Sequence, residues 1–172
     1  MRLALKAKEM IEENAISVED VVVGGTSTAK LSGRIPGITE ITPGEYIFYD
    51  YANVKSGLVP IDSCALSVRS TVMSKPETNR IVIDGGLKTF CFEEAEYPHL
   101  KNAALRGRFL DLSEEHGIIR LTKGTQGVKV GDILEILPYR VGPCINLHDK
   151  MFLIRNGRLE SVIPILGRGM TT

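Results

Sequence analysis

The sequence predicts a mainly β protein, in which an antiparallel β-barrel or sandwich follows a short α/β segment. Short runs rich in β-branched and aromatic residues succeed one another from Cys64 onward, with no long helical pattern between them. Before Cys64, a helical pattern leads into a short apolar run, which is typical of α/β structure. We therefore expect two parts, α/β elements in residues 1–60 and a β domain in residues 61–172.

The first 60 residues predict one helix and two strands. Leu3, Met10 and Ile11 recur at helical spacing among charged residues, so an amphipathic helix is expected to end near Asn14. The apolar residues 21–23 predict a buried strand of the parallel type, which stops at a pair of glycines. Residues 45–50 (EYIFYD) predict a second strand.

The β domain is expected to contain a series of short strands, in residues 65–73, 80–84, 117–121, 132–137, 151–155 and 159–165. Asn156-Gly157 separates the last two runs, and both residues tolerate positive φ. The last two strands are therefore expected to form an antiparallel hairpin. Residues 92–106 show no clear period and predict a loop with room for one helical turn.

Composition indicates a globular protein whose partner is a small molecule or another protein. Charged residues make up 24% and apolar residues 43% of the chain, which argues against disorder. The 21 basic and 21 acidic residues balance, so no net field attracts nucleic acid or a membrane surface. Three cysteines without CxxC spacing indicate a reducing compartment, and no apolar run approaches the ~20 residues of a membrane span. We expect a cytoplasmic protein.

The segment Gly24-Gly25-Thr26 is a candidate phosphate-binding loop. It follows the predicted buried strand, and glycines let backbone N–H groups converge on an anion while a threonine adds a hydroxyl donor. Taken alone, these three residues favour a plain tight turn between strand and helix over a phosphate-binding loop.

A set of sequence blocks resembles one family. GGTSTAK, ITEITPGEYIFYDY, DSCALSV, IVIDGGLK, LSEEHGII, KVGDILEILP and INLHDKMFLIRNGRL occur here in the order in which similar blocks occur in the D-threonine aldolase and D-serine dehydratase-like family. The combination of LSEEHG with the VGD and NLHD blocks is the most specific part of this resemblance. It covers residues 21–169.

The resemblance implies an alanine racemase-like build, in which an N-terminal (β/α)8 barrel holds pyridoxal phosphate on a lysine and a β domain closes the site. An eight-stranded barrel needs ~250 residues, so residues 1–60 are expected to be the last elements of such a barrel. Gly24, Gly25 and Thr26 then match the residues that bind the cofactor phosphate. The lysine that carries the cofactor is expected to lie outside this chain, which alone is expected to be inactive. It is matched by none of Lys6, Lys8, Lys30, Lys55, Lys75 and Lys88.

The main departure from the family pattern concerns the divalent metal. Many members carry a His-x-Cys or similar pair just before the NLHD block, and this sequence has Arg140 and Gly142 there. Neither residue is a zinc ligand, so no metal site is predicted. Cys144 and His148 are expected to lie ~13 Å apart on an extended strand, too far to share an ion. Arg140 becomes a candidate substrate-binding residue.

His116 in the SEEHG block is the candidate catalytic residue, as a proton carrier or a group that orients the cofactor ring. A turn histidine held by the neighbouring glutamates is the alternative. Asp84-Gly85-Gly86 is expected to form a structural turn in which glycine supplies positive φ.

Three functions follow from these expectations. The first is part of a pyridoxal-phosphate-dependent lyase that acts on D-amino acids with a β-hydroxyl, either as an aldolase or as a dehydratase. The second is a metal-independent racemase-like or cofactor-binding protein in which Arg140 recognises an extra substrate carboxylate. The third is a free-standing β domain for assembly. In the first two, the partners are a D-amino acid and either a second copy of the chain or a missing N-terminal half.

Overall fold

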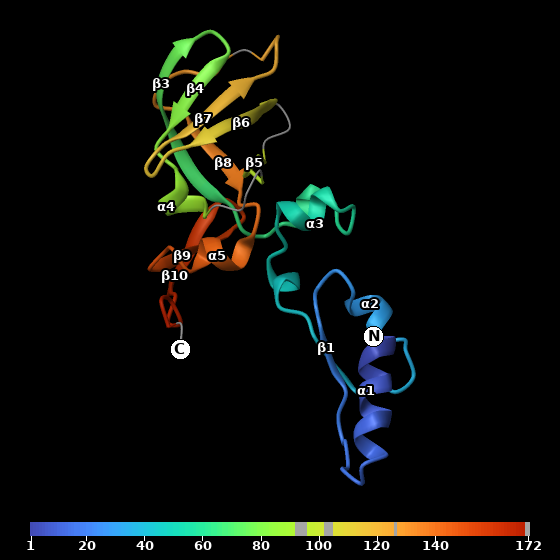
Figure 1. The fold of residues 1–172 in the computed structure, drawn as a ribbon. Coiled ribbons are helices and arrows are strands. Elements are labelled where there is room, and N and C mark those ends of the chain that lie inside the picture. The colour runs from blue at the N-terminus through green and yellow to red at the C-terminus, as the bar shows by residue number, and fades with distance from the viewer. Residues whose placement is uncertain (92–95, 102–104, 126, 171–172) are drawn as a thin grey trace. The chain divides into compact units, whose positions relative to one another are not determined.

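The computed structural model describes residues 1–91, 96–101, 105–125 and 127–170 (Figure 1). The chain divides into two compact units, Met1–Ile47 and Phe48–Thr172. The sequence analysis placed the division after residue 60. Residues 48–60 belong to the second unit because their backbone is bonded to it: the Ala65 N–H donates to Phe48 O (2.8 Å) and the Tyr51 N–H to Pro138 O (3.1 Å).

The first unit is a small α/β arrangement. Its elements are α1 (Arg2–Glu12), β1 (Val22–Gly24), α2 (Ala29–Ser32), β2 (Glu40–Thr42) and a 3-10 turn, η1 (Glu45–Ile47). β1 and β2 pair in parallel, with Val23 opposite Ile41, and α2 lies between them in the chain. The predicted amphipathic helix and a parallel strand at the predicted place are therefore both present. The expected burial of this strand was wrong, because Val22 and Gly24 are exposed and Val23 is half-buried in a sheet of only two strands.

The predicted strand at residues 45–50 is wrong. The second parallel strand is β2, five residues earlier, and residues 45–47 form the 3-10 turn. Tyr49 has a φ of 52°, which a strand does not allow, and Asp50 caps the next helix. The run EYIFYD has high β-propensity, but the turn at Tyr49 and the helix cap at Asp50 override it.

The second unit is built on a six-stranded antiparallel sheet in the order β5-β8-β3-β4-β7-β6. β5 and β6, the two ends of this order, lie near each other, so the sheet closes almost into a barrel (Figure 1). The strands are β3 (Val68–Glu77), β4 (Arg80–Ile83), β5 (His99–Leu100), β6 (Gly107–Leu112), β7 (Gly117–Leu121) and β8 (Ile133–Leu137). The prediction of a mainly β fold with an antiparallel barrel is confirmed.

Short helices and a hairpin complete the second unit. They are α3 (Tyr51–Lys55), η2 (Ile61–Ser63), α4 (Leu87–Phe90), α5 (Val141–Ile145), β9 (Lys150–Arg155) and β10 (Arg158–Pro164). β9 and β10 pair antiparallel as predicted, and Asn156 and Gly157 have φ values of 49° and 73°. Positive φ at both central residues is the geometry of a type I′ turn.

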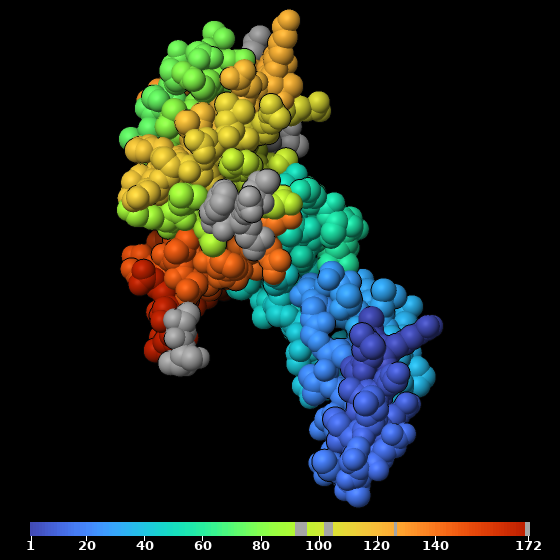
Figure 2. Space-filling model, viewed as in Figure 1, coloured from blue at the N-terminus to red at the C-terminus, as the bar shows by residue number. Residues whose placement is uncertain are grey.

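The core lies inside the six-stranded sheet. Val72, Ile81, Ile83, Ile119 and Ile136 are completely buried there. The side chains of β6 and β7, coloured yellow, cover one side of this body in the space-filling view (Figure 2).

No described helix is long and apolar enough to cross a membrane.

Two strands of the second unit were not predicted from the sequence, and each has a physical reason. β6 contains a shift of register between Phe109 and Asp111, so its buried residues Phe109 and Leu112 are three apart instead of two. β5 has only two residues and falls within the segment predicted as a loop. The remainder of that prediction, residues 92–95 and 102–104, lies outside the described residues.

Glycine in the Asp84-Gly85-Gly86 turn serves close packing and not positive φ. Gly86 has a φ of −124°, an ordinary value. A Cβ there would lie 2.3 Å from Ser113 O and 2.6 Å from both Glu114 O and His116 N, all of them backbone atoms. The expectation of a structural turn holds, but the reason given for its glycine was wrong.

We predict that Gly86→Ala lowers the free energy of unfolding by about 2 kcal/mol, because backbone atoms have to move to admit the methyl group. Gly142→Ala is the matched control, since a Cβ at Gly142 meets nothing within 4 Å and Gly142 lies in a helix. Urea titration followed by circular dichroism measures both variants. Equal stabilities of the two would contradict the prediction.

Candidate functional site

The Gly24–Thr26 loop lies at the carboxyl end of the parallel strand β1, and α2 starts three residues after it. Gly25 has a φ of +100°, which other residues rarely adopt, and a Cβ at Gly24 would lie 3.2 Å from Thr42 Oγ1. The Thr28 hydroxyl donates to Gly24 O (3.2 Å) and to Gly25 O (3.3 Å). The glycines and Thr28 together hold the loop in one conformation.

The side-chain hydroxyl of Thr26 indicates that this loop binds an anion. Its Oγ1 is buried and has no hydrogen-bond partner within the part of the chain that the structure describes. A buried hydroxyl without a partner is unfavourable, and a phosphate oxygen would satisfy it. The donor set therefore fits the phosphate group of pyridoxal phosphate.

Arg140 is the residue immediately before α5, and its side chain is 42% exposed. Its Nε lies 3.8 Å from Oδ2 of Asp50, a carboxylate that is completely buried. Asp50 Oδ1 accepts the Asn53 N–H (3.0 Å), and Oδ2 accepts the Val141 N–H (3.1 Å). A buried acid thus joins the start of α3 to the start of α5 beside the arginine.

Residues from three separate segments gather around Tyr51 and Tyr139, the latter being the residue before Arg140, and sequence reasoning missed them. The Tyr51 ring stacks on His99 at 4.1 Å and meets the edge of Tyr139 at 6.4 Å. Lys55 Nζ lies 2.7 Å from Glu96 Oε2 and 5.6 Å from the centre of the Tyr139 ring. No spacing in the sequence signals this cluster, because its members come from α3, the β5 region and the segment before α5.

Lys55 and Glu96 of this cluster stabilise each other's charged forms. The hydrogen bond with Glu96 raises the pKa of Lys55, and the same bond lowers the pKa of Glu96. Burial lowers the pKa of His99, which favours its neutral form. The cluster therefore combines an ion pair with an imidazole whose neutral form is favoured, around the residue that precedes Arg140.

His116 lies in the tight turn between β6 and β7, and its side chain is exposed. Its backbone N–H donates to Ser113 Oγ (3.2 Å) and its carbonyl accepts the Ser113 N–H (2.9 Å). The turn is held by α4, whose Leu87 N–H donates to Ser113 O (2.8 Å). The structure thus brings the DGGLK and SEEHG blocks together.

The two glutamates before His116 pair with a lysine and not with the histidine. Lys88 Nζ lies 2.6 Å from Glu115 Oε1 and 2.9 Å from Glu114 Oε2. Hydrogen bonds to both carboxylates raise the pKa of Lys88 and keep it protonated. The turn is therefore anchored by Lys88, which the alternative of a histidine held by the glutamates did not foresee.

The expected separation of Cys144 and His148 was wrong. Residues 141–145 form α5 and not an extended strand, so Cys144 Sγ lies 4.0 Å from His148 Nε2. Both atoms contact one acceptor, Thr89 O, at 3.3 Å from the sulfur and 3.0 Å from the nitrogen. Burial raises the pKa of Cys144 to about 12, so its thiol stays protonated. Hydrogen bonding to Thr89 O accounts for the pair.

Arg140 and Gly142 do not fit a divalent metal. The Arg140 side chain ends in a positively charged guanidinium, and Gly142 has no side chain to bind an ion. Among the described residues, no group of three or more His, Cys, Asp or Glu side chains is arranged to hold an ion.

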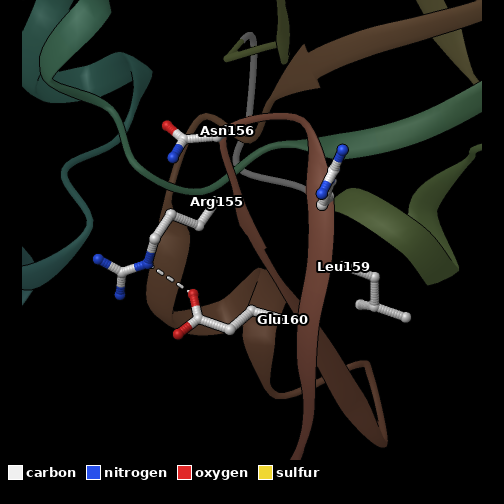
Figure 3. Close-up of a pocket in the computed structure, with 5 residues that line it drawn as sticks. Arg155, Asn156, Leu159 and Glu160 are labelled. Atoms are coloured by element: carbon white, nitrogen blue, oxygen red, sulfur yellow. Dashed lines mark hydrogen bonds and ion pairs between the residues drawn. The ribbon is translucent and has the colours of Figure 1, made fainter.

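One shallow depression on the second unit involves none of these groups. It is formed at the β9–β10 turn by Arg155, Asn156, Arg158, Leu159 and Glu160 (Figure 3). Arg155 Nε pairs with Glu160 Oε2 at 2.6 Å across it. None of the residues predicted from the sequence to form the site lines this depression, and it carries no argument for the site.

Comparison with known proteins identifies the family of this chain. The family model "Putative serine dehydratase domain" matches residues 65–154. The chain is 31% identical to a D-threonine aldolase of Arthrobacter sp over 99% of its own length and 45% of that protein. It is 27% identical to a 3-hydroxy-D-aspartate aldolase of Paracoccus denitrificans (strain Pd 1222) over 95% of its length and 43% of that protein.

The fold comparison agrees with the sequence comparison. The crystal structure of a D-threonine aldolase from Filomicrobium marinum superposes with a TM-score of 0.86 at 22% identity, covering 99% of this chain and 47% of that one. The chain thus spans about half the length of the relatives it matches. From the family match over residues 65–154, with the likeness of the whole chain to these proteins, we conclude that the chain belongs to the serine dehydratase domain family.

Proposed function

We propose that this chain is the C-terminal part of a pyridoxal-phosphate-dependent lyase that acts on D-amino acids with a β-hydroxyl group. Support comes from the family match and from two relatives that are, by name, aldolases of D-threonine and of 3-hydroxy-D-aspartate. The first unit, with its parallel strand pair, would be the end of the barrel that holds the cofactor.

The observation that carries the proposal is the buried, unpartnered Thr26 hydroxyl in a loop shaped by Gly24 and Gly25. This loop follows a parallel strand, and phosphate groups bind at the carboxyl ends of such strands in α/β barrels. Gly24, Gly25 and Thr26 would therefore hold the phosphate of the cofactor. When bound, pyridoxal phosphate serves as an electron sink for cleavage next to the amino-acid Cα.

Arg140 would replace the metal in recognising the substrate. A metal polarises the β-oxygen as a Lewis acid, whereas a guanidinium offers hydrogen bonds and a fixed charge. A hydroxyl leaving group is activated less in this way, so we propose aldol cleavage rather than dehydration as the principal reaction. His116 would hold or move a proton from its exposed turn.

A second candidate function is recognition of a substrate with an additional carboxylate by Arg140, in a metal-independent lyase or racemase-like protein. It is favoured by the partial exposure of the guanidinium and by the name of the Paracoccus relative, whose substrate is a hydroxy derivative of a dicarboxylic amino acid. Planar bidentate recognition of carboxylates is the usual use of arginine.

To test the phosphate loop, this chain would replace the matching segment of the Arthrobacter D-threonine aldolase. We predict that the chimera retains pyridoxal phosphate and that Thr26→Val weakens its affinity about ten-fold through loss of one charge-assisted hydrogen bond. Equilibrium dialysis measures this affinity.

Thr26→Ser, which keeps the hydroxyl, is expected to retain the affinity of the parent chimera. The chain alone is expected to turn over neither D-threonine nor D-serine, because the cofactor-binding lysine would lie in the part of its relatives that this chain does not match. A folded chimera whose affinity is indifferent to Thr26→Val would refute the phosphate loop.

A separate experiment tests whether Arg140 and Gly142 stand at the positions of metal ligands. We predict that Arg140→His combined with Gly142→Cys creates a zinc site that binds about ten-fold more tightly than in either single variant, because two ligands then act together. A Cβ at Gly142 meets no atom within 4 Å, so a cysteine fits. Isothermal titration with zinc measures the affinity.

Adding Cys144→Ser to this double variant is the control, and binding should persist because Cys144 already bonds Thr89 O. A full equivalent of zinc bound by the unmodified chain would instead show that the alignment of Arg140 and Gly142 with metal ligands is wrong.

We also propose that the chain associates with a second copy or with the rest of a barrel. Leu3, Met10 and Ile11 on α1 are 81%, 56% and 40% exposed, and no residue of α1 is buried. An apolar helix face and a two-stranded sheet of this kind are stable only when covered.

Light scattering should therefore show the chain larger than a monomer at high concentration. Leu3→Glu with Met10→Glu is expected to reduce this association, whereas the control Lys6→Glu, on an exposed lysine of the same helix, is not. A monodisperse monomer would contradict the prediction.

A further inference from the structure

The buried carboxylate of Asp50 contacts both segments that form the surroundings of Arg140. Asp50 is completely buried, and its two oxygens accept backbone N–H groups of Asn53 and Val141. Those groups belong to α3 and α5, which are about ninety residues apart in the chain. Asp50 therefore sets the distance between the two helix starts.

A buried carboxylate is stable only when hydrogen bonds and a positive charge offset its loss of water. Backbone N–H groups supply the hydrogen bonds, and Arg140 supplies a positive charge, with Nε 3.8 Å from Oδ2. The Arg140 Nε atom is itself buried, although 42% of the side chain is exposed. One edge of the guanidinium group thus faces the acid, while the side chain still reaches the surface.

Hydrogen bonds also fix the backbone on both sides of Arg140. The Tyr51 N–H donates to Pro138 O and the Ala52 N–H to Tyr139 O, each at 3.1 Å. With the bond from Val141 to Asp50, hydrogen bonds are made on both sides of Arg140 along the chain. Its Cα position and the direction of its side chain therefore both depend on residues 50–52.

We propose that Asp50 is a positioning residue: it holds the inner edge of the Arg140 guanidinium so that the outer edge meets a carboxylate of the substrate. This inference rests on the proposed role of Arg140 in substrate binding. A long, flexible side chain loses rotamer entropy on binding, and a partner that orients it beforehand reduces that loss.

The first experiment measures hydrogen exchange of the Arg140 Nε–H by NMR in the ¹⁵N-labelled chain, with the signal assigned from Arg140→Lys. Asp50→Asn keeps the shape of the side chain but removes its charge. We expect exchange of this proton to become about ten-fold faster in Asp50→Asn while the backbone amide spectrum stays dispersed.

Asp84→Asn is the matched control, since Asp84 also accepts a backbone N–H, from Thr71 at 2.7 Å, in another part of the unit. It should leave the Arg140 signal unchanged. Unchanged exchange in Asp50→Asn would overturn the inference. If Asp50→Asn does not fold, the unmodified chain decides: Arg140 Nε–H has to exchange more slowly than that of Arg108, which is exposed on β6, and equal rates overturn the inference.

The second experiment tests recognition with two small acids that differ by one carboxylate. D-Malate, and not D-lactate, is expected to shift the Arg140 Nε–H signal, and Asp50→Asn to weaken the response to D-malate about ten-fold. Equal shifts by both acids, or none, would refute the substrate-binding role of Arg140 and the inference with it. A normal response to D-malate in Asp50→Asn would refute the role of Asp50 alone and leave the proposed function standing. Neither experiment needs the cofactor.

Discussion

The second unit depends on a carboxylate that has no access to water. Asp50 connects the start of α3 to the start of α5, and through Arg140 it connects the interior to the surface. Removing one partner of such an arrangement leaves a buried charge unpaired, which costs more than the pair itself contributes. The segment before the barrel is therefore part of the second unit.

The barrel itself depends on close backbone approach. Gly86 allows α4 to lie against the turn of residues 113–116, and a side chain at Gly117 would meet Gly85 O at 2.8 Å. These contacts join two sequence blocks, DGGLK and SEEHG, that are separated by more than twenty residues. The turn that carries His116 is thus positioned by backbone packing, and Lys88 pairs with both of its glutamates.

The candidate functional groups are divided between the two units. The Gly24–Thr26 loop, proposed to bind phosphate, belongs to the first unit, and Arg140, Asp50 and the cluster around Tyr139 belong to the second. In a lyase of this family, one unit would hold the cofactor and the other would select the substrate. Under the proposed function, Arg140 and Gly142 would stand where other members carry metal ligands, and the substrate would be selected by hydrogen bonding and charge in place of coordination.

The sequence by itself determined the fold class, the helix α1, the parallel strand β1, most strands of the barrel and the hairpin at Asn156-Gly157. These features depend on local periodicity and on φ preferences, which are written into neighbouring residues. It also indicated the family, from the order of the blocks.

Only the tertiary structure decided the rest. The bulge in β6 hid its strand pattern, and the left-handed turn at Tyr49 overrode a run with high β-propensity. The helical conformation of residues 141–145 brought Cys144 and His148 within 4.0 Å, where an extended chain would separate them. The partnership of Asp50 with Arg140 lay beyond sequence reasoning, because contacts between residues ninety positions apart follow from packing and burial and leave no periodic signal in the chain.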